Sequence, residues 1–295
     1  MEILYTPDER FQNLPGYHFA PNYVEVETGL RMHFVDEGPK DGEVVLLLHG
    51  QPSWSYLYRK MIPSFVAKGY RTIAPDLVGF GKSGKPTQQS DYTYASHVKW
   101  MESFLAKLDL QGIHVFIQDW GGLIGLRCIA NDPGRFKTIT AANTGMPTGD
   151  QQMPEAFSQW VKFVKTIPLL PCGSILQNAT VSKLSKEEMA AYDAPFPDVA
   201  YQAGAKIFPS LVPAKPDNPA SEDNRQAWKK LMQLDLPVLT LFSDQDPITK
   251  GGEKVFQKLM PGAKHDKHST IEAGGHFLQE DKGEEIAQKM IEFIS

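Results

Sequence analysis

Short apolar runs alternate with longer amphipathic stretches through the first half of the chain. Residues 23–27 and 31–35 alternate in character around Thr28-Gly29, which predicts a hairpin of half-exposed strands. Solid apolar runs, typical of strands buried on both faces of a parallel sheet, lie at residues 44–49, 70–75, 113–117 and 136–142. Stretches with helical spacing separate them, at residues 54–68, 94–108 and 121–130. This order predicts a mainly parallel sheet with helices on both faces.

The strand pattern stops near Asn143 and returns only at residues 237–242. Amphipathic helices are predicted in between, at residues 154–166 and 186–192, and prolines interrupt them. Ten of the 22 prolines of the chain lie between residues 144 and 220. Because proline starts and stops helices, we expect this segment to consist of short helices.

A last strand near residues 268–272 and a helix over residues 284–293 complete the pattern. We therefore expect an α/β core formed by residues 1–143 and 221–295. A helical cap, residues 144–220, is expected to be inserted between two strands of that core.

Composition narrows the class of protein further. The 295 residues are 41% hydrophobic and 22% charged, with a formal net charge of −5, which excludes a disordered chain. No run rich in Lys and Arg is present, so nucleic acid is not expected as a partner. The longest aliphatic run, residues 44–48, is far shorter than a membrane span. The N-terminus lacks the pattern of a signal peptide, so we expect a cytoplasmic protein. Cys128 and Cys172 are the only cysteines, too few for a zinc site, and no metal is expected.

One strand is expected to run directly into a helix at residues 117–122. The sequence Ile-Gln-Asp-Trp-Gly-Gly places Asp119 at the apex of a sharp turn, above the carboxyl edge of the sheet. Lipase-like hydrolases carry their nucleophilic serine at this point of a Gly-x-Ser-x-Gly turn. A helix-capping aspartate is the ordinary alternative for this hexapeptide.

Two further residues follow strands and could complete a catalytic triad with Asp119. His276 lies in a loop after the last predicted strand, and Asp246 lies just beyond the strand before it. Asp244 competes with Asp246, but an Asp-Pro pair at this distance from the strand fits the hydrolase pattern better. The order nucleophile, acid, base is the one expected of α/β-hydrolases. Alone, each residue has a structural explanation, and together they indicate a triad.

The loop after residues 44–49 is expected to supply part of an oxyanion hole. The backbone N–H groups of Gln51 and Trp120 are the predicted donors. The glycine-rich segment 76–83 is interpreted as structural.

At this point the chain resembles the haloalkane dehalogenases of the α/β-hydrolase superfamily, specifically subfamily I. The resemblance covers nearly the whole chain, with its main motifs at residues 6–11, 21–23, 49–63, 118–122, 194–198 and 201–204. It implies the α/β-hydrolase fold, with an eight-stranded, mostly parallel sheet flanked by helices and an inserted helical cap domain.

The resemblance also implies a role for each site residue. Asp119 matches the nucleophile, His276 the general base and Asp246 the acid that orients it. Trp120 matches the halide-binding tryptophan that follows the nucleophile. Trp160, in Phe157-Ser158-Gln159-Trp160, matches the second halide donor that subfamily I takes from its cap. Other subfamilies use an asparagine at the position of Gln51.

The implied reaction needs only a small haloalkane and water, and it releases an alcohol, a halide ion and a proton. No cofactor and no metal are implied, and we expect a monomer without a membrane partner. By the same resemblance the substrate cavity is lined by Leu123, Phe157, Phe208, Pro209, Ile248 and Phe277. Carboxylate attack at a saturated carbon gives an ester on Asp119, and water activated by His276 then hydrolyses it.

The main alternative is an epoxide hydrolase, which shares the aspartate nucleophile and the His–Asp pair. That reaction needs two cap tyrosines, for which Tyr192 and Tyr201 are candidates. A fluoroacetate dehalogenase needs basic residues near the nucleophile, and residues 118–122 contain none. A non-catalytic binding protein of the same fold is expected to lose a triad member, and this chain keeps all three.

Overall fold

A central sheet of eight strands organises the molecule. The computed structural model describes residues 1–295. Along the sheet the order is β10-β9-β8-β7-β4-β5-β3-β2, and β1 and β6 form a separate antiparallel pair. The β2–β3 and β3–β5 pairings are antiparallel, and the remaining pairs are parallel. The predicted, mostly parallel eight-stranded sheet is therefore confirmed.

The strands are β1 (Ile3–Leu4), β2 (Asn22–Glu27), β3 (Leu30–Glu37), β4 (Val44–Leu48), β5 (Arg71–Pro75), β6 (Lys85–Pro86), β7 (Ile113–Gln118), β8 (Phe136–Ala142), β9 (Val238–Ser243) and β10 (Ser269–Ile271). The helices are α1 (Ile62–Ala67), α2 (Tyr94–Lys107), α3 (Trp120–Asn131), α4 (Glu155–Thr166), α5 (Cys172–Asn178), α6 (Lys186–Asp193), α7 (Ala203–Leu211), α8 (Ser221–Leu231), α9 (Glu253–Leu259) and α10 (Leu278–Ile294).

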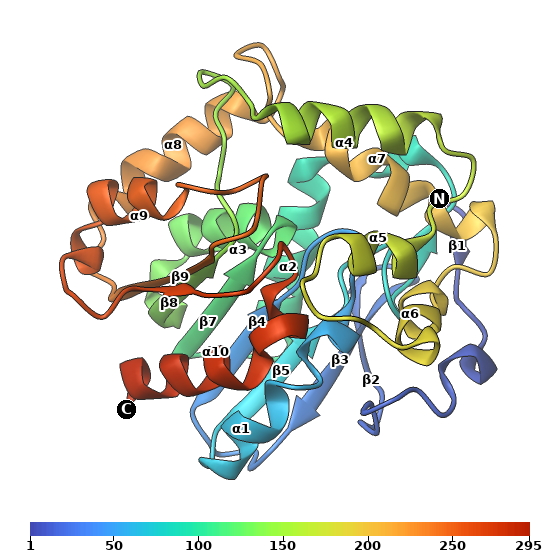
Figure 1. Cartoon of the computed structure of the whole chain (residues 1–295), viewed down its shortest axis with the longest axis horizontal. Coiled ribbons are helices and arrows are strands. Elements are labelled where there is room, and N and C mark those ends of the chain that lie inside the picture. The colour runs from blue at the N-terminus through green and yellow to red at the C-terminus, as the bar shows by residue number, and fades with distance from the viewer.

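Helices cover both faces of the sheet. Helices α1 and α10 pack together on one face, and α2, α3 and α8 pack on the other (Figure 1). Every residue of β4, β7 and β9 is buried, as their largely apolar sequences predict. None of the helices is both long and apolar enough to cross a membrane.

Helices α4 to α8 lie between β8 and β9, with no strand among them, and α4 to α7 fall within residues 144–220. Figure 1 shows α4, α5 and α7 gathered beyond one edge of the sheet. In the parallel register Leu48 lies beside Ile117, and Ile117 lies beside Ala141. The carboxyl ends of β4, β7 and β8 therefore reach the same edge, and the loops that follow them meet beneath the inserted helices.

One predicted helix is broken in the structure. Residues 54–68 were expected to form a single helix, but they form a 3₁₀ turn, Ser55–Tyr58, followed by α1. Pro63 explains the break, because proline lacks an N–H and its ring crowds the carbonyl of the preceding turn. It is tolerated at the start of α1, where no intrahelical donor is needed.

Candidate active site

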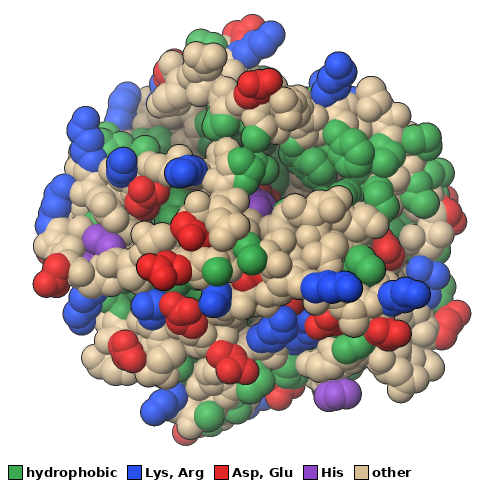
Figure 2. Space-filling view, in the orientation of Figure 1, with side chains coloured by type: hydrophobic (Ala, Val, Ile, Leu, Met, Phe, Trp, Pro, Cys, Tyr) green, Lys and Arg blue, Asp and Glu red, His purple; other side chains and the backbone are tan.

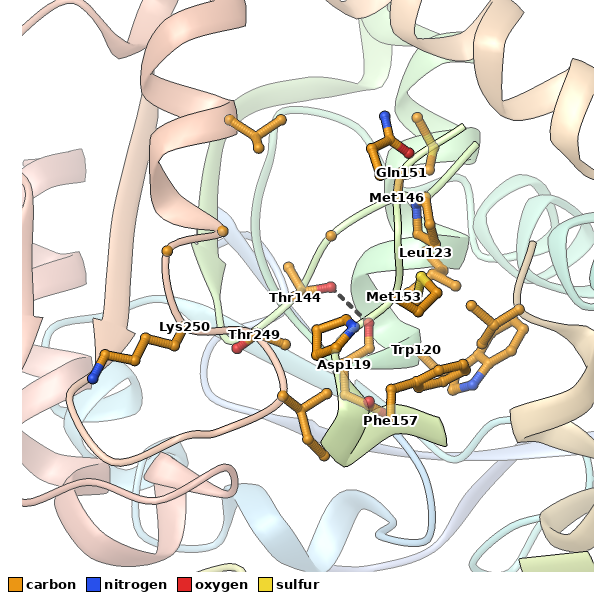
Figure 3. A pocket seen from close by; sticks show the side chains of 18 of the residues that line it. Asp119, Trp120, Leu123, Thr144, Met146, Gln151, Met153, Phe157, Thr249 and Lys250 are labelled. Atoms are coloured by element: carbon orange, nitrogen blue, oxygen red, sulfur yellow. Dashed lines mark hydrogen bonds between the residues drawn. The ribbon is translucent and has the colours of Figure 1, made fainter. Parts of the chain in front are cut away.

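Asp119 occupies a strained turn between β7 and α3. Its backbone has φ of 49° and ψ of −125°, a conformation that residues with a side chain rarely adopt. Neighbouring loops hold it there. The Asp119 amide donates to the carbonyl of Asn143 at 3.1 Å, and the Thr144 hydroxyl donates to the Asp119 carbonyl at 2.7 Å (Figure 3). The predicted apex position is thus found, with its side chain aimed away from the sheet edge.

The carboxylate of Asp119 is contacted from two sides. The Gln51 amide N–H donates to its Oδ1 at 2.7 Å, and His276 Nε2 lies 3.4 Å from its Oδ2. Gly50 makes this approach possible, because a Cβ at that position would lie 2.0 Å from Asp119 Oδ1. The glycine of the His49-Gly50-Gln51 loop therefore leaves room for the carboxylate.

His276 is linked in turn to Asp246. The Nδ1 atom of His276 lies 2.9 Å from Asp246 Oδ2, and both side chains are buried. Asp246 also accepts hydrogen bonds from the Ile248 amide at 2.9 Å and from the Thr249 hydroxyl. Its competitor Asp244 is exposed and contacts the Gly274 amide instead. Of the two aspartates only Asp246 contacts His276, and the turn that follows Asp246 holds its carboxylate in place through Ile248 and Thr249.

The charges of this row of residues are coupled. Burial disfavours the charge of Asp246, but the facing His276 and the hydrogen-bond donors outweigh burial and lower the pKa of the carboxyl to about 2. Burial likewise opposes protonation of His276, yet the Asp246 and Asp119 carboxylates raise the pKa of the imidazole to about 10. The two facing carboxylates therefore favour the protonated form of His276 in the unreacted site.

The indole N–H of Trp120 is free. Four of the five tryptophans donate this hydrogen bond within the protein: Trp54 to Ala191, Trp100 to Glu27, Trp160 to Gln51 and Trp228 to Met146. The Trp120 ring packs against Phe208 and Tyr94, with centroid separations of 4.5 and 5.3 Å. Its orientation is thus fixed by aromatic packing while its donor remains available beside Asp119.

Trp160 comes from the inserted helix α4 and reaches the same site through Gln51. Its Nε1 donates to Gln51 Oε1 at 3.2 Å, and Gln51 Nε2 donates to the Ala205 carbonyl at 2.7 Å. Because a carbonyl only accepts, Ala205 fixes which end of the Gln51 amide faces the indole. Gln51 thus contacts the Asp119 carboxylate through its backbone and Trp160 through its side chain.

A cavity of about 740 Å³ opens above these residues. Figure 2 shows it as a hollow bordered by hydrophobic side chains, and Figure 3 shows Asp119, Trp120 and Phe157 converging on it. Asp119, Trp120, Trp160, His276 and Gln51 line it, together with five of the predicted apolar residues: Leu123, Phe157, Pro209, Ile248 and Phe277.

Phe208 was expected on the cavity wall but does not lie there. It is fully buried behind Trp120, where it also packs on His97 at 4.5 Å and on Phe80 at 4.8 Å. Consecutive helical residues point about 100° apart, so α7 turns Pro209 toward the cavity and Phe208 toward the core.

Several residues around the site were not identified from the sequence. The Thr249 hydroxyl donates to the Asp246 carboxylate. Its place three residues after the aspartate of an Asp-Pro turn is a pattern from which this contact could have been predicted. Asn143 donates to the carbonyls of Gly275 and His276, at 3.0 and 3.1 Å. Nothing in the sequence marks that contact, because it joins loops more than a hundred residues apart. Further apolar wall residues are Met146, Met153, Ile175 and Val212.

The two tyrosines considered for an epoxide hydrolase do not face the cavity. Tyr192 is fully buried and donates its hydroxyl to Glu280, and Tyr201 is not among the lining residues. Neither hydroxyl is placed to polarise an epoxide oxygen above Asp119.

Comparisons with known proteins agree with this arrangement. The model of the family described as "alpha/beta hydrolase fold" matches residues 43–283. A haloalkane dehalogenase from Psychrobacter cryohalolentis is 54% identical over all of this chain and 98% of its own length. One from Mycobacterium marinum is 48% identical over 99% of both chains. The solved tetrameric haloalkane dehalogenase of Paraglaciecola agarilytica is 36% identical, with a TM-score of 0.93 over 99% of this chain and 98% of its own.

Proposed function

Because this chain belongs to the haloalkane dehalogenases of the α/β-hydrolase superfamily, we propose that it releases halide from small 1-halo- and 1,2-dihaloalkanes in two steps at Asp119. The observation that carries the proposal is the meeting of three groups in one apolar cavity. These are a carboxylate at its floor, a free indole N–H beside it, and an imidazole 3.4 Å from the carboxylate.

In the first step an oxygen of Asp119 attacks the halogen-bearing carbon from the side opposite the halogen. A carbon–oxygen bond forms, the carbon–halogen bond breaks, and the halogen leaves with the bonding electrons as halide. The apolar wall excludes water that would otherwise solvate the carboxylate and weaken it as a nucleophile. The product is an alkyl ester of Asp119.

The leaving halide gains a full negative charge in this step. We assign its stabilisation to the indole N–H groups of Trp120 and Trp160, because an indole nitrogen donates and never accepts. The Trp120 donor is free, whereas Trp160 donates to Gln51 and must share or exchange that acceptor for the halide. Donors aimed at charge that develops in the transition state accelerate the reaction.

In the second step water attacks the ester carbonyl, and His276 accepts a proton from that water. Esterification removes the charge of Asp119, one of the two carboxylates that hold the pKa of His276 high. The imidazolium then releases its proton to solvent more readily, which is the acid formed by the overall reaction, and the neutral imidazole can take the proton of the attacking water. Asp246 orients it and stabilises the imidazolium. The Gln51 and Trp120 amides are the proposed donors to the oxyanion, after which the alcohol leaves and Asp119 is restored.

We further propose that residues 144–220 act as the cap of this site and that the enzyme is of subfamily I. The inserted helix α4 carries Phe157 and Trp160 into the cavity. The other subfamilies' asparagine position holds Gln51, whose oxygen accepts from Trp160. A second halide donor supplied by the cap is the feature of subfamily I.

The test is the incubation of purified protein with 1-bromobutane, 1,2-dibromoethane and styrene oxide. We expect bromide, alcohol and acid from both bromoalkanes and no diol from styrene oxide. Diol formation without any bromide release would favour the epoxide hydrolase and exclude the proposed reaction.

The proposed assembly is a monomer of 32.9 kDa. The Paraglaciecola relative was solved as a tetramer, so the mass in solution separates the two states. Light scattering across a dilution series is the measurement, and a stable mass of four chains would contradict the monomer.

A further inference from the structure

Gln118 ends β7 directly before Asp119, and its side chain lies against His276 instead of entering the cavity. It is fully buried and is not among the residues that line the cavity. Its Nε2 lies 3.3 Å from the His276 Nε2 and 3.2 Å from the His276 carbonyl oxygen. A primary amide thus contacts the very nitrogen to which the proposed mechanism transfers a proton.

The carbonyl of His276 settles which way this amide points. A carbonyl oxygen only accepts, and it already receives a second hydrogen bond from Asn143 Nδ2 at 3.1 Å. The nitrogen of Gln118 must therefore face His276, because a reversed amide would bring two oxygens together. The Gln118 Oε1 atom is buried and has no hydrogen-bond partner.

This orientation favours one protonation state of the imidazole. Gln118 has two N–H groups, so one can bond the carbonyl while the other points at Nε2. An N–H donor stabilises a lone pair on Nε2 and opposes a proton there. The charged groups facing the ring are Asp246 at Nδ1 and Asp119 at Nε2, and both favour the imidazolium. Gln118 is the contact that acts in the opposite direction.

We propose that Gln118 is a positioning residue that keeps Nε2 of His276 unprotonated once Asp119 has become an ester and yields that lone pair to the attacking water during hydrolysis. The inference rests on the proposed two-step reaction. Before esterification, Asp119 dominates the charge at Nε2. After esterification Asp119 is neutral, and the Gln118 N–H is the remaining polar contact at that nitrogen. Gln118 therefore assists hydrolysis of the ester and leaves its formation nearly unchanged.

The variant Gln118→Met tests this by removing the donor while keeping the length of the side chain. Rapid mixing with 1-bromobutane measures bromide released in the first turnover, and intact-mass spectrometry follows the decay of the alkyl-enzyme. We expect a first-turnover rate close to that of the wild type and a decay about tenfold slower, as for the loss of one hydrogen bond. The acid limb of the decay rate should move to higher pH by roughly one unit.

Gln118→Glu is the second variant, because it keeps the shape if the methionine variant does not fold. A carboxylate beside Nε2 favours the imidazolium, so the acid limb should again move upward, and ester decay should slow at neutral pH. Gln279→Met is the matched control. Gln279 is a buried glutamine three residues after His276 whose amide makes no hydrogen bond. Its pH profile should follow the wild type.

The outcomes are separable. A wild-type protein that releases no bromide overturns the proposed function and this inference with it. An active wild type accompanied by folded Gln118 variants with unchanged ester decay overturns the inference alone. Equal slowing of both steps without a shift of the pH profile also overturns it, because that result describes a purely structural residue.

Discussion

At the scale of single residues, the site is a row of coupled charged groups. His276 lies between Asp119 and Asp246, and both carboxylates raise the pKa of the imidazole. A positive charge between two negative ones is stable in the resting site and unsuited to removing a proton. In the proposed reaction, conversion of Asp119 to an ester removes one of these two negative charges, so loss of the proton from His276 becomes easier before the hydrolytic step.

Replacement of His276 separates the two proposed steps. The His276→Phe variant should form the ester and fail to hydrolyse it, because the nucleophile remains and the base is gone. With 1-bromobutane, intact-mass spectrometry should detect one added butyl group on the protein. His18, an exposed residue, provides the control variant His18→Phe. Full turnover by His276→Phe without any adduct would contradict the assignment of the base.

The two tryptophans can be tested through halide binding. Trp160→Phe removes one N–H donor to an anion, and such a bond contributes enough to weaken bromide binding about tenfold or more. Bromide titration followed by fluorescence gives the dissociation constant. Trp100→Phe is the matched control, because Trp100 donates to Glu27 and does not line the cavity. Unchanged bromide affinity in Trp160→Phe would place the halide elsewhere.

At the scale of elements, the site depends on strand ends that meet at one edge of a parallel sheet. The register of β4, β7 and β8 brings Gly50, Asp119 and Asn143 together. The Asp119 carboxylate lies so close to the backbone of Gly50 that any side chain at that position would collide with it. The sharp turn, the order of the strands and the absence of a Cβ at Gly50 together determine the position of the Asp119 carboxylate.

Gly50→Ala tests that geometry. A Cβ there would lie 2.0 Å from Asp119 Oδ1, so the carboxylate must move and the contact from the Gln51 amide must lengthen. We expect bromide release to fall about a hundredfold or more, since displacement of a reacting group by about 1 Å has an effect of that size. Gly134→Ala is the control, because its Cβ would meet only Asp132 Oδ1, at 3.9 Å. Equal activities of the two variants would contradict this view of the turn.

At the scale of the whole molecule, a buried ion cluster joins the inserted helices to the core. Glu280 of α10 is fully buried and binds Arg59, Lys60 at 2.8 Å and the Tyr192 hydroxyl of α6. Arg59 also contacts Glu188 of α6 at 2.8 Å. Glu280 lies four residues after His276, so the cluster connects helix α6 of the inserted region to the start of α10, next to the loop that carries His276.

Glu280→Gln should destabilise the protein by about 3–5 kcal/mol, because it leaves Arg59 buried without its main counter-charge. Glu43→Gln, at a half-exposed pair with Lys137, should cost at most about 1 kcal/mol. Urea unfolding of both variants measures the difference. Equal costs would show that the cluster does not stabilise the fold.

The difference in unfolding free energy between the wild type and Glu280→Gln should depend on pH in a defined direction. Burial raises the pKa of Glu280, but Arg59 and Lys60 outweigh burial and leave it below its ordinary value. A lowered folded-state pKa gives stability that is present above the unfolded pKa and is lost as pH falls through the folded one. The gap between wild type and Glu280→Gln should therefore narrow below about pH 4. A constant gap would exclude ionised Glu280 as its source.

The sequence by itself determined the sheet, the inserted helices and the order of the triad. Local patterns carry this information, because they can be read from neighbouring residues alone. They are the apolar runs of the buried strands, the strand-to-helix turn at Asp119 and the polar residues that follow strands. The sequence did not determine the direction of Phe208, which depends on what packs against that residue. The break at Pro63 has a local cause, the missing N–H and the ring of proline, and was therefore available in the sequence.

Only the tertiary structure decided how the site is supported. Gln118 and Asn143 reach His276 across more than 130 residues, and Gln51 reaches Trp160 across 109. The orientation of the amide side chains and the free donor of Trp120 depend on which atoms the fold brings within 3 to 4 Å. The residue types indicate the chemistry, and their mutual contacts decide which atom of each is available for it.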